Sequence, residues 1–220
     1  GINSDSMISY DSVYFGYAPN YDPQVTMADL NQATGQKGAT YNIYSQITSD
    51  NVNSDSYNGN DQYPIDDIIS SGAVLIASLM PFVEWMDITP GLCESVASFF
   101  ESTFTSQGVT VWLRFAHEMN YYSAVGTYPV NYDEFMIAWK NMYNAVSSND
   151  KIYMFWSPND DTSSEPVGPW WPGKQYVDIV GMDYYPNADQ GLPDFGTAYG
   201  DFYDSYAAKH GLPFAIGETG

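Results

Sequence analysis

The chain has 220 residues and a formal net charge of −21, from 27 acidic and only 6 basic side chains. This balance argues against a nucleic-acid partner, because phosphate neutralisation needs lysine and arginine, and it disfavours an anionic membrane surface for the same reason. Aromatic residues make up 17% of the chain, with 20 Tyr and 6 Trp. Their apolar faces and polar edges suit a neutral, hydroxyl-rich ligand such as a sugar.

The residue types that hold metals and form disulfides are scarce. Cys93 is the single cysteine, so an intrachain disulfide or a multi-cysteine zinc site cannot form. The two histidines, His117 and His210, leave few options for a His-based metal site. We therefore expect a protein that needs no metal or other cofactor. The longest apolar run, Gly72–Val83, is too short to span a bilayer and predicts a buried strand.

Short apolar runs along the chain predict seven β-strands. Most of these runs are apolar on both faces, as expected of a parallel sheet covered by helices. In chain order they are Val13–Ala18, Thr40–Gln46, Ala73–Met80, Thr110–Ala116, Lys151–Trp156, Tyr176–Met182 and Pro213–Gly217.

Amphipathic stretches between these runs predict helices. Their spacing places one helix after each of Thr26, Pro64 and Asn131, one over Leu92–Phe104, and one that ends at Gly211. The connection Ser157–Gln175 is rich in Pro, Gly and Trp and predicts little helix. The segment Ser49–Asp61 is crowded with Asp, Asn, Ser and Gly, which predicts a solvated loop, with calcium binding as the alternative.

The order of these elements predicts the fold. Seven strand-then-helix steps without a linker favour an α/β fold, a single (β/α)8 TIM barrel, over an open sheet. No Gly-rich fingerprint follows the first strand, which argues against a dinucleotide-binding fold. The sequence ends directly after the seventh strand. We therefore expect residues 1–220 to form one catalytic barrel domain, C-terminally truncated, with the eighth βα unit absent.

Two glutamates follow the fourth and seventh predicted strands, where a barrel collects its chemistry. They are Glu118 and Glu218. Glutamate is poorly suited to a strand interior and is costly to bury, so their joint placement favours function over two solvated strand-end acids. Cleavage of a glycosidic bond requires two carboxyl groups, one protonated to assist the leaving oxygen and one ionised to attack the anomeric carbon.

Five motifs around these strand ends carry a family resemblance. They are Arg-x-x-His-Glu-Met-Asn at 114–120, Trp-Ser-Pro at 156–158, Trp-Pro-Gly at 171–173, Tyr-Val-Asp-Ile-Val-Gly-x-Asp-x-Tyr at 176–185 and Gly-Glu-Thr-Gly at 217–220. In this order and placement they resemble glycoside hydrolase family 26, from about Ala73 to the end of the chain. The resemblance implies a retaining endo-β-glycanase that works by double displacement, with Glu118 as general acid/base and Glu218 as nucleophile.

The resemblance also implies roles for the neighbours of the two glutamates. His117 would hydrogen-bond either Glu118 or the sugar at the cleaved bond, and Asn120 would bind substrate. Tyr185 would donate to Glu218 and keep it ionised and oriented.

A second group of residues supports the site from below. Arg114 is the only arginine in the chain, and strand alternation places Arg114, Ala116 and Glu118 on one face, so Arg114 points into the barrel. Asp183 would support the network around Glu218. A structural ion pair and a direct catalytic role both stay open for Arg114.

Four tryptophans are candidates for sugar contacts. Trp156 is expected to form the floor of the subsite that holds the cleaved sugar, with a core role as the alternative. Trp85, Trp170 and Trp171 are candidate stacking platforms, although large aromatics in loops are as often packing residues.

The substrate is the least specified part of this interpretation. Tyr121–Gly126 follows Asn120, where many family members have Gly and a cluster of Trp. We expect a neutral polysaccharide or oligosaccharide partner, first β-1,4-mannan, then mixed-linkage or β-1,3-glucan or β-1,3-xylan. A non-catalytic carbohydrate-binding barrel and a calcium-dependent structural domain are the rival classes. The acidic, Ser- and Tyr-rich, Lys-poor composition is typical of secreted hydrolases, so we expect an extracellular monomer.

Overall fold

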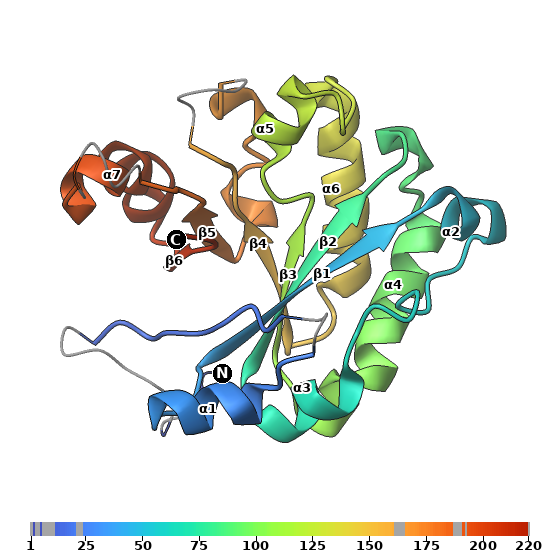
Figure 1. Cartoon of the computed structure of the whole chain (residues 1–220). Helices are drawn as coiled ribbons and strands as arrows, with labels where there is room; N and C mark the ends of the chain where they lie inside the picture. Colours follow the sequence, from blue (N-terminus) through green and yellow to red (C-terminus); the bar gives the residue numbers. More distant parts are fainter. Residues whose placement is uncertain are drawn as a thin grey trace.

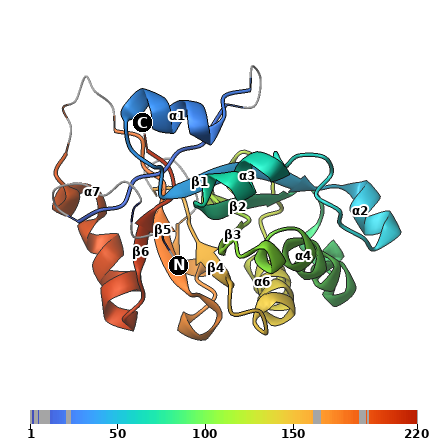
Figure 2. The same cartoon turned by 90° about the horizontal axis from the view of Figure 1, so that it is seen from below.

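The computed structural model describes residues 2, 5, 12–20, 24–160, 166–186, 191 and 193–219. Within these residues, six strands form one parallel sheet in the order β1-β2-β3-β4-β5-β6. The strands are β1 (Thr40–Ile47), β2 (Val74–Pro81), β3 (Val111–Phe115), β4 (Ile152–Trp156), β5 (Ile179–Met182) and β6 (Phe214–Ile216). Each strand pairs with its neighbour in sequence, as in a β/α barrel, and the sheet curls between its two ends (Figure 1, Figure 2).

The first predicted strand is the main departure from the expected sheet. Val13–Ala18 forms no regular strand: Tyr14 and Tyr17 each take part in an isolated bridge, and Tyr17 pairs in parallel with Tyr41. The amide of Tyr17 donates to the carbonyl oxygen of Thr40 at 3.0 Å, and the carbonyl oxygen of Tyr17 accepts from Asn42 at 2.8 Å. The segment therefore runs along β1 at the edge of the sheet, where a single neighbouring ladder gives weaker support to regular pairing than two do.

Seven α-helices lie in the described part of the chain. They are α1 (Met27–Thr34), α2 (Ser49–Ser54), α3 (Ile65–Ser71), α4 (Pro90–Thr103), α5 (Met119–Ala124), α6 (Tyr132–Val146) and α7 (Phe195–Phe202). The predicted caps are present: the side chain of Thr26 accepts from Asp29 and that of Asn131 accepts from Glu134. The short helix α2 was not expected. The segment from Ser49, predicted as a loop, begins with a helical turn that follows the N-cap residue Thr48.

The core fixes the ends of the strands in place. β2 is buried along its whole length, and α4 and α6 pack side by side against one face of the sheet (Figure 1). The helix predicted after Asn131 is α6, and its buried stripe consists of Phe135, Ala138, Trp139, Met142 and Val146. Burying such side chains contributes roughly 1.5–3 kcal/mol each. The carboxyl ends of the strands thus form a stable base for polar groups.

The connections hold little regular structure apart from these helices. Short helical turns occur at Trp85–Asp87, Thr105–Gln107, Gly168–Trp170, Lys174–Tyr176, Tyr203–Ala207 and Ala208–His210. The last two continue α7 to Gly211, whose φ of 67° ends the helix where the sequence predicts. Among the helices of the described residues, none combines the length and the apolar character that crossing a bilayer requires.

Candidate active site

Two site residues, Arg114 and Glu118, lie at the end of β3 and are positioned by different backbone conformations. Arg114 lies within the strand and is fully buried. After Phe115 the backbone turns through positive φ values, 50° at Ala116 and 49° at Glu118. The strand alternation expected to continue to Glu118 therefore stops at Phe115, and Glu118 is aimed by a left-handed turn that starts α5. Such backbone conformations cost about 1–3 kcal/mol each in a residue with a side chain and are concentrated at functional sites.

The buried guanidinium of Arg114 donates hydrogen bonds to side chains from three other strands or strand ends. Its Nη1 donates to Oε1 of Glu218 at 2.6 Å and to Oγ of Ser78 at 3.0 Å, and its Nη2 donates to Asp183. Ser78 in turn donates to Oδ1 of Asn42 at 2.7 Å. Arg114 is therefore both a buried ion-pair partner, through Asp183, and a direct contact of a candidate catalytic carboxylate.

The surroundings of Glu218 favour its ionised form. Burial raises the pKa of Glu218, but the charge of Arg114 and the hydrogen bond from the hydroxyl of Tyr185 lower it well below its ordinary value. The hydroxyl of Tyr185 donates to Oε2 at 2.5 Å, so the contact expected from the sequence is present. Burial and this hydrogen bond raise the pKa of Tyr185, so its hydroxyl keeps its proton.

Glu118 has the opposite tendency. Its side chain is almost buried, with the residue 7% exposed. Burial raises the pKa of Glu118, the hydrogen bond from Asn159 lowers it, and the charge of Glu218 raises it, so that the result lies above the ordinary value. Two neighbouring carboxyl groups with pKa values pushed apart are what acid–base and nucleophilic roles require.

His117 lies beside Glu218 as a neutral ring. Burial and the charge of Arg114 hold the pKa of His117 well below its ordinary value. Its Nε2 is 3.7 Å from Oε1 of Glu218, and its ring contacts the rings of Tyr44 and Tyr122, with centroid distances of 5.5 and 5.6 Å. The structure thus places His117 against the second glutamate, whereas the sequence analysis expected it beside Glu118 or the sugar.

Asn120 has a different place from the one expected. It was a candidate substrate ligand, but it is fully buried and its side chain hydrogen-bonds the backbone of Asn159. Oδ1 of Asn120 accepts from the amide of Asn159, and Nδ2 donates to the carbonyl oxygen of the same residue, both at 2.9 Å. Asn159 itself was missed, although it directly follows the Trp-Ser-Pro motif at the end of β4, where polar residues signal a site.

Gly217 is required by the close packing beneath Glu218. A Cβ at this position would lie 2.3 Å from Oδ1 of Asp183, 2.6 Å from Oγ of Ser157 and 2.9 Å from Nη2 of Arg114. Asp183 is itself fully buried and accepts from Oγ of Ser157 at 2.8 Å. Only glycine leaves room for this buried cluster under the carboxylate.

Known proteins resemble this chain in sequence and in fold. The sequence profile of glycosyl hydrolase family 26 matches residues 89–205. The chain belongs to this family. A segment of 97 residues, 40% of this chain, is 31% identical to the mannan endo-1,4-beta-mannosidase A and B of Caldalkalibacillus mannanilyticus and matches 19% of that protein's length.

Solved structures of family 26 show the same fold. The β-mannanase of Bacteroides ovatus gives a TM-score of 0.63 at 16% identity, over 96% of this chain and 70% of that one. The Bacillus subtilis mannanase gives 0.64 at 18% identity, over 99% and 73%. A β-mannanase from a protist symbiont of the termite Reticulitermes speratus, solved with a gluco-manno-oligosaccharide, gives 0.61 at 17% identity, over 94% and 73%.

The tryptophans of this family 26 chain serve mainly as core. Trp85 and Trp170, expected as stacking platforms, are both fully buried. Their rings contact each other and Phe135, and Trp85 also contacts Tyr128. Neither ring has a face to offer a ligand, and the helical turn Trp85–Asp87 folds Trp85 inward onto α6.

Trp156 and Trp171 belong to a second aromatic cluster, which lies beside α7. Trp156 is fully buried, and its ring stacks on Phe202. It therefore takes the core role that was the alternative to a subsite floor. Trp171 is half-buried and contacts Trp156, Tyr206 and His210. Its described ring contacts are with this cluster and not with the surroundings of the two glutamates.

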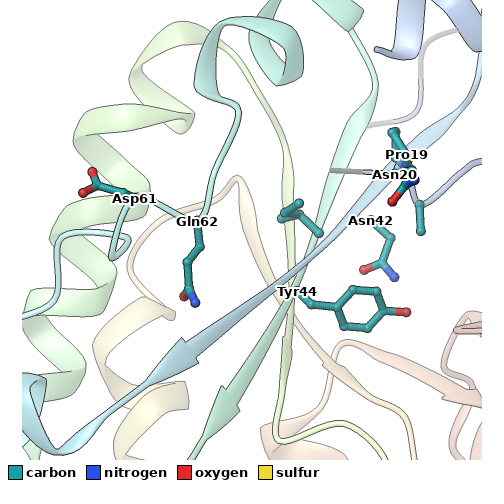
Figure 3. A pocket seen from close by; sticks show the side chains of 8 residues that line it. Pro19, Asn20, Asn42, Tyr44, Asp61 and Gln62 are labelled. Carbon is teal, nitrogen blue, oxygen red and sulfur yellow. The ribbon is translucent and has the colours of Figure 1, made fainter. Parts of the chain in front are cut away.

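A hollow of about 550 Å³ lies along β1 next to the site (Figure 3). It is lined by Ala18, Pro19, Asn20, Asn42, Ile43, Tyr44, Asp61 and Gln62. Asn42 and Tyr44 project from the same side of β1 in Figure 3. Tyr44 also contacts the ring of His117. Burial and the nearby charge of Glu218 raise the pKa of Tyr44. The hollow therefore borders the carboxylate site. Tyr44 could not be singled out from the sequence, since one tyrosine among 20 carries no signal of its own.

Proposed function

We propose that this family 26 chain is a retaining endo-β-glycanase that cleaves β-1,4-mannan. The observation that carries the proposal is the pair of strand-end glutamates whose pKa values are displaced in opposite directions, downward at Glu218 and upward at Glu118. Mannan is favoured over other β-linked polymers because the related proteins named above are mannanases or mannosidases.

The two glutamates divide a double displacement between them. In the first step, an oxygen of Glu218 attacks the anomeric carbon, while the Glu118 carboxyl group gives its proton to the departing glycosidic oxygen. In the second step, ionised Glu118 takes a proton from water, and this water displaces Glu218 from the sugar. The enzyme returns to its starting protonation state, and the sugar keeps its anomeric configuration.

The neighbouring residues prepare Glu218 for attack. Arg114 and Tyr185 hold one carboxylate oxygen each, so the group is oriented and ionised before substrate arrives. His117 stays neutral beside it and therefore adds no second positive charge that would weaken the nucleophile.

The hollow beside Tyr44 provides space for further sugar units of the polymer. Its amide side chains, Asn20, Asn42 and Gln62, offer donors and acceptors to hydroxyl groups. Since a cell-wall polymer does not cross a membrane, we place this activity outside the cell.

Release of reducing ends from a polysaccharide panel tests the proposal. The panel contains galactomannan, mixed-linkage β-glucan, β-1,3-glucan, β-1,3-xylan and β-1,4-xylan. We expect release from galactomannan, with the anomeric configuration retained when the products are followed by NMR. Glu218→Gln should reduce turnover at least about 10⁴-fold, while Glu101→Gln on the exposed face of α4 should have no effect.

Each other result has a defined meaning. Release from another polymer alone would replace mannan as substrate, and inverted product would remove Glu218 as the nucleophile. Retention of soluble galactomannan on an affinity gel without hydrolysis, unchanged in Glu218→Gln, would favour a binding protein instead.

A further inference from the structure

The acid/base candidate accepts a hydrogen bond from the side-chain amide of Asn159, a residue whose backbone is held in place. Nδ2 of Asn159 donates to Oε1 of Glu118 at 2.5 Å. The backbone amide and carbonyl of Asn159 are both bound by the side chain of Asn120, at 2.9 Å each. Because Asn120 is fully buried, its two hydrogen bonds are shielded from competing water and are costly to break.

The segment around Asn159 is also fastened to two other strand ends. Asn159 forms a parallel bridge with Asp183. The amide of Asp183 donates to the carbonyl oxygen of Pro158 at 2.9 Å, and its carbonyl oxygen accepts from Asp160 at 3.0 Å. The carbonyl oxygen of Ser157 accepts from the amide of Glu118 at 2.8 Å. The residues after β4 thus extend the sheet beyond its regular end and form a stiff support for the Asn159 amide.

We propose that Asn159 is the positioning residue that decides which oxygen of Glu118 carries the catalytic proton. Oε1 accepts the amide hydrogen, so the proton of the neutral acid resides on Oε2, which becomes the oxygen that serves the leaving group. Asn120 acts one step further out, by holding Asn159. This inference rests on the proposed function for its chemical consequence, but the hydrogen bond itself can be tested without it.

The charged groups near Glu118 act on its pKa in a different way from the neutral Asn159. Glu218 and Asp160 raise the pKa of Glu118, and Arg114 lowers it. The hydroxyls of Tyr122 and Tyr128 also lie within its field, and burial raises the pKa of both, so they are neutral at working pH. Asn159 is uncharged and acts only through its hydrogen bond, which favours the ionised carboxylate.

Asn159→Ala, studied with aryl β-mannobiosides, tests the proposal through the leaving group. A phenyl leaving group needs protonation, whereas a 2,4-dinitrophenyl group does not. We expect kcat/KM for the phenyl substrate to fall about tenfold, with little change for the dinitrophenyl substrate. The alkaline limb of the pH profile should move to higher pH, because loss of the amide favours protonated Glu118. Asn120→Ala should act in the same direction but more weakly, and the exposed Asn144→Ala on α6 should match the wild type.

Titration of the Glu118 carboxyl carbon by ¹³C NMR, assigned with Glu118→Gln, provides a readout that needs no turnover. The pKa of Glu118 should be higher in Asn159→Ala than in the wild type. An unmoved pKa, or equal losses on the two leaving groups, overturns the inference. If the wild type cleaves neither substrate, the proposed function has failed, and the titration alone then decides whether Asn159 holds Oε1. Circular dichroism melts identify a variant that does not fold, in which case Asn120→Ala decides by the same criteria.

Discussion

The two glutamates of the site are the same residue type in similar burial, yet their surroundings differ in kind. Glu218 at the end of β6 is bonded to a cation and a phenol, Arg114 and Tyr185. Glu118 at the end of β3 is bonded to a neutral amide, Asn159. Burial raises the pKa of both. The identity of the donor therefore decides which carboxyl group is ionised, and burial alone does not.

The removal of Arg114 should have the largest effect on stability. Arg114→Met leaves the carboxylates of Asp183 and Glu218 without their buried cation. We expect the free energy of unfolding at pH 7, measured with urea, to fall by about 3–5 kcal/mol. The loss should shrink toward pH 4, because protonation relieves the unpaired charges. Lys140→Met, which removes a surface cation above the ring of Tyr176, should cost less than about 1 kcal/mol.

Equal losses for Arg114→Met at both pH values would show that Arg114 stabilises the sheet by packing. In that case the ionisation of Glu218 would not depend on the cation, and the contrast between the two carboxyl groups would need another cause.

Tyr185→Phe should change catalysis more than stability. The hydroxyl that lowers the pKa of Glu218 is lost, so the acidic limb of the pH profile should move to higher pH, and kcat should fall about tenfold. Tyr185 is 54% exposed, so the free energy of unfolding should change by less than about 1 kcal/mol. The alkaline limb, which belongs to Glu118, should stay in place. Tyr153→Phe on β4 is the matched control, and an unmoved acidic limb in Tyr185→Phe would contradict the assignment of Glu218.

Glu118→Gln should give the smallest change in the free energy of unfolding, and the sign of this change is well defined. The folded-state pKa of Glu118 is raised, so the stability linked to its neutral form is fully present below the unfolded pKa and is lost as pH rises through the folded pKa. At pH 7 the uncharged amide should therefore raise the free energy of unfolding by up to about 1 kcal/mol.

The same substitution at the other glutamate should have the opposite sign. The pKa of Glu218 is lowered, so its contribution is present above the unfolded pKa and is lost as pH falls. Glu218→Gln should thus destabilise the protein at pH 7. Urea unfolding of both variants at pH 7 and at low pH checks this pair, and changes of equal sign would contradict the contrast.

Much of the architecture could be read from local patterns. Six of the seven predicted strands are present, and the caps at Thr26 and Asn131 are as expected, because apolar periodicity and caps depend on neighbours in sequence. The exception, Val13–Ala18, has strand-like composition, but its regularity depends on partners on both sides of it.

Most contacts among the supporting residues of the site could not be read in this way. Asn120 and Asn159 are 39 positions apart, and Arg114 and Glu218 are 104 apart. Ser78 carried a faint signal as a polar residue inside an apolar strand. Trp85 and Trp156 have the composition of sugar platforms, and only their packing shows that they face the core.

The sequence by itself determined the alternation of strands and helices, the strand-end glutamates and the family motifs, because each of these is written in neighbouring residues. Only the tertiary structure decided what each polar side chain touches. The turn at Ala116 and Glu118 ends the strand alternation, and the donors that separate the two carboxyl groups come from different strands. Their pKa values depend on distances in space, since electrostatics and hydrogen bonding act across the sheet and not along the chain.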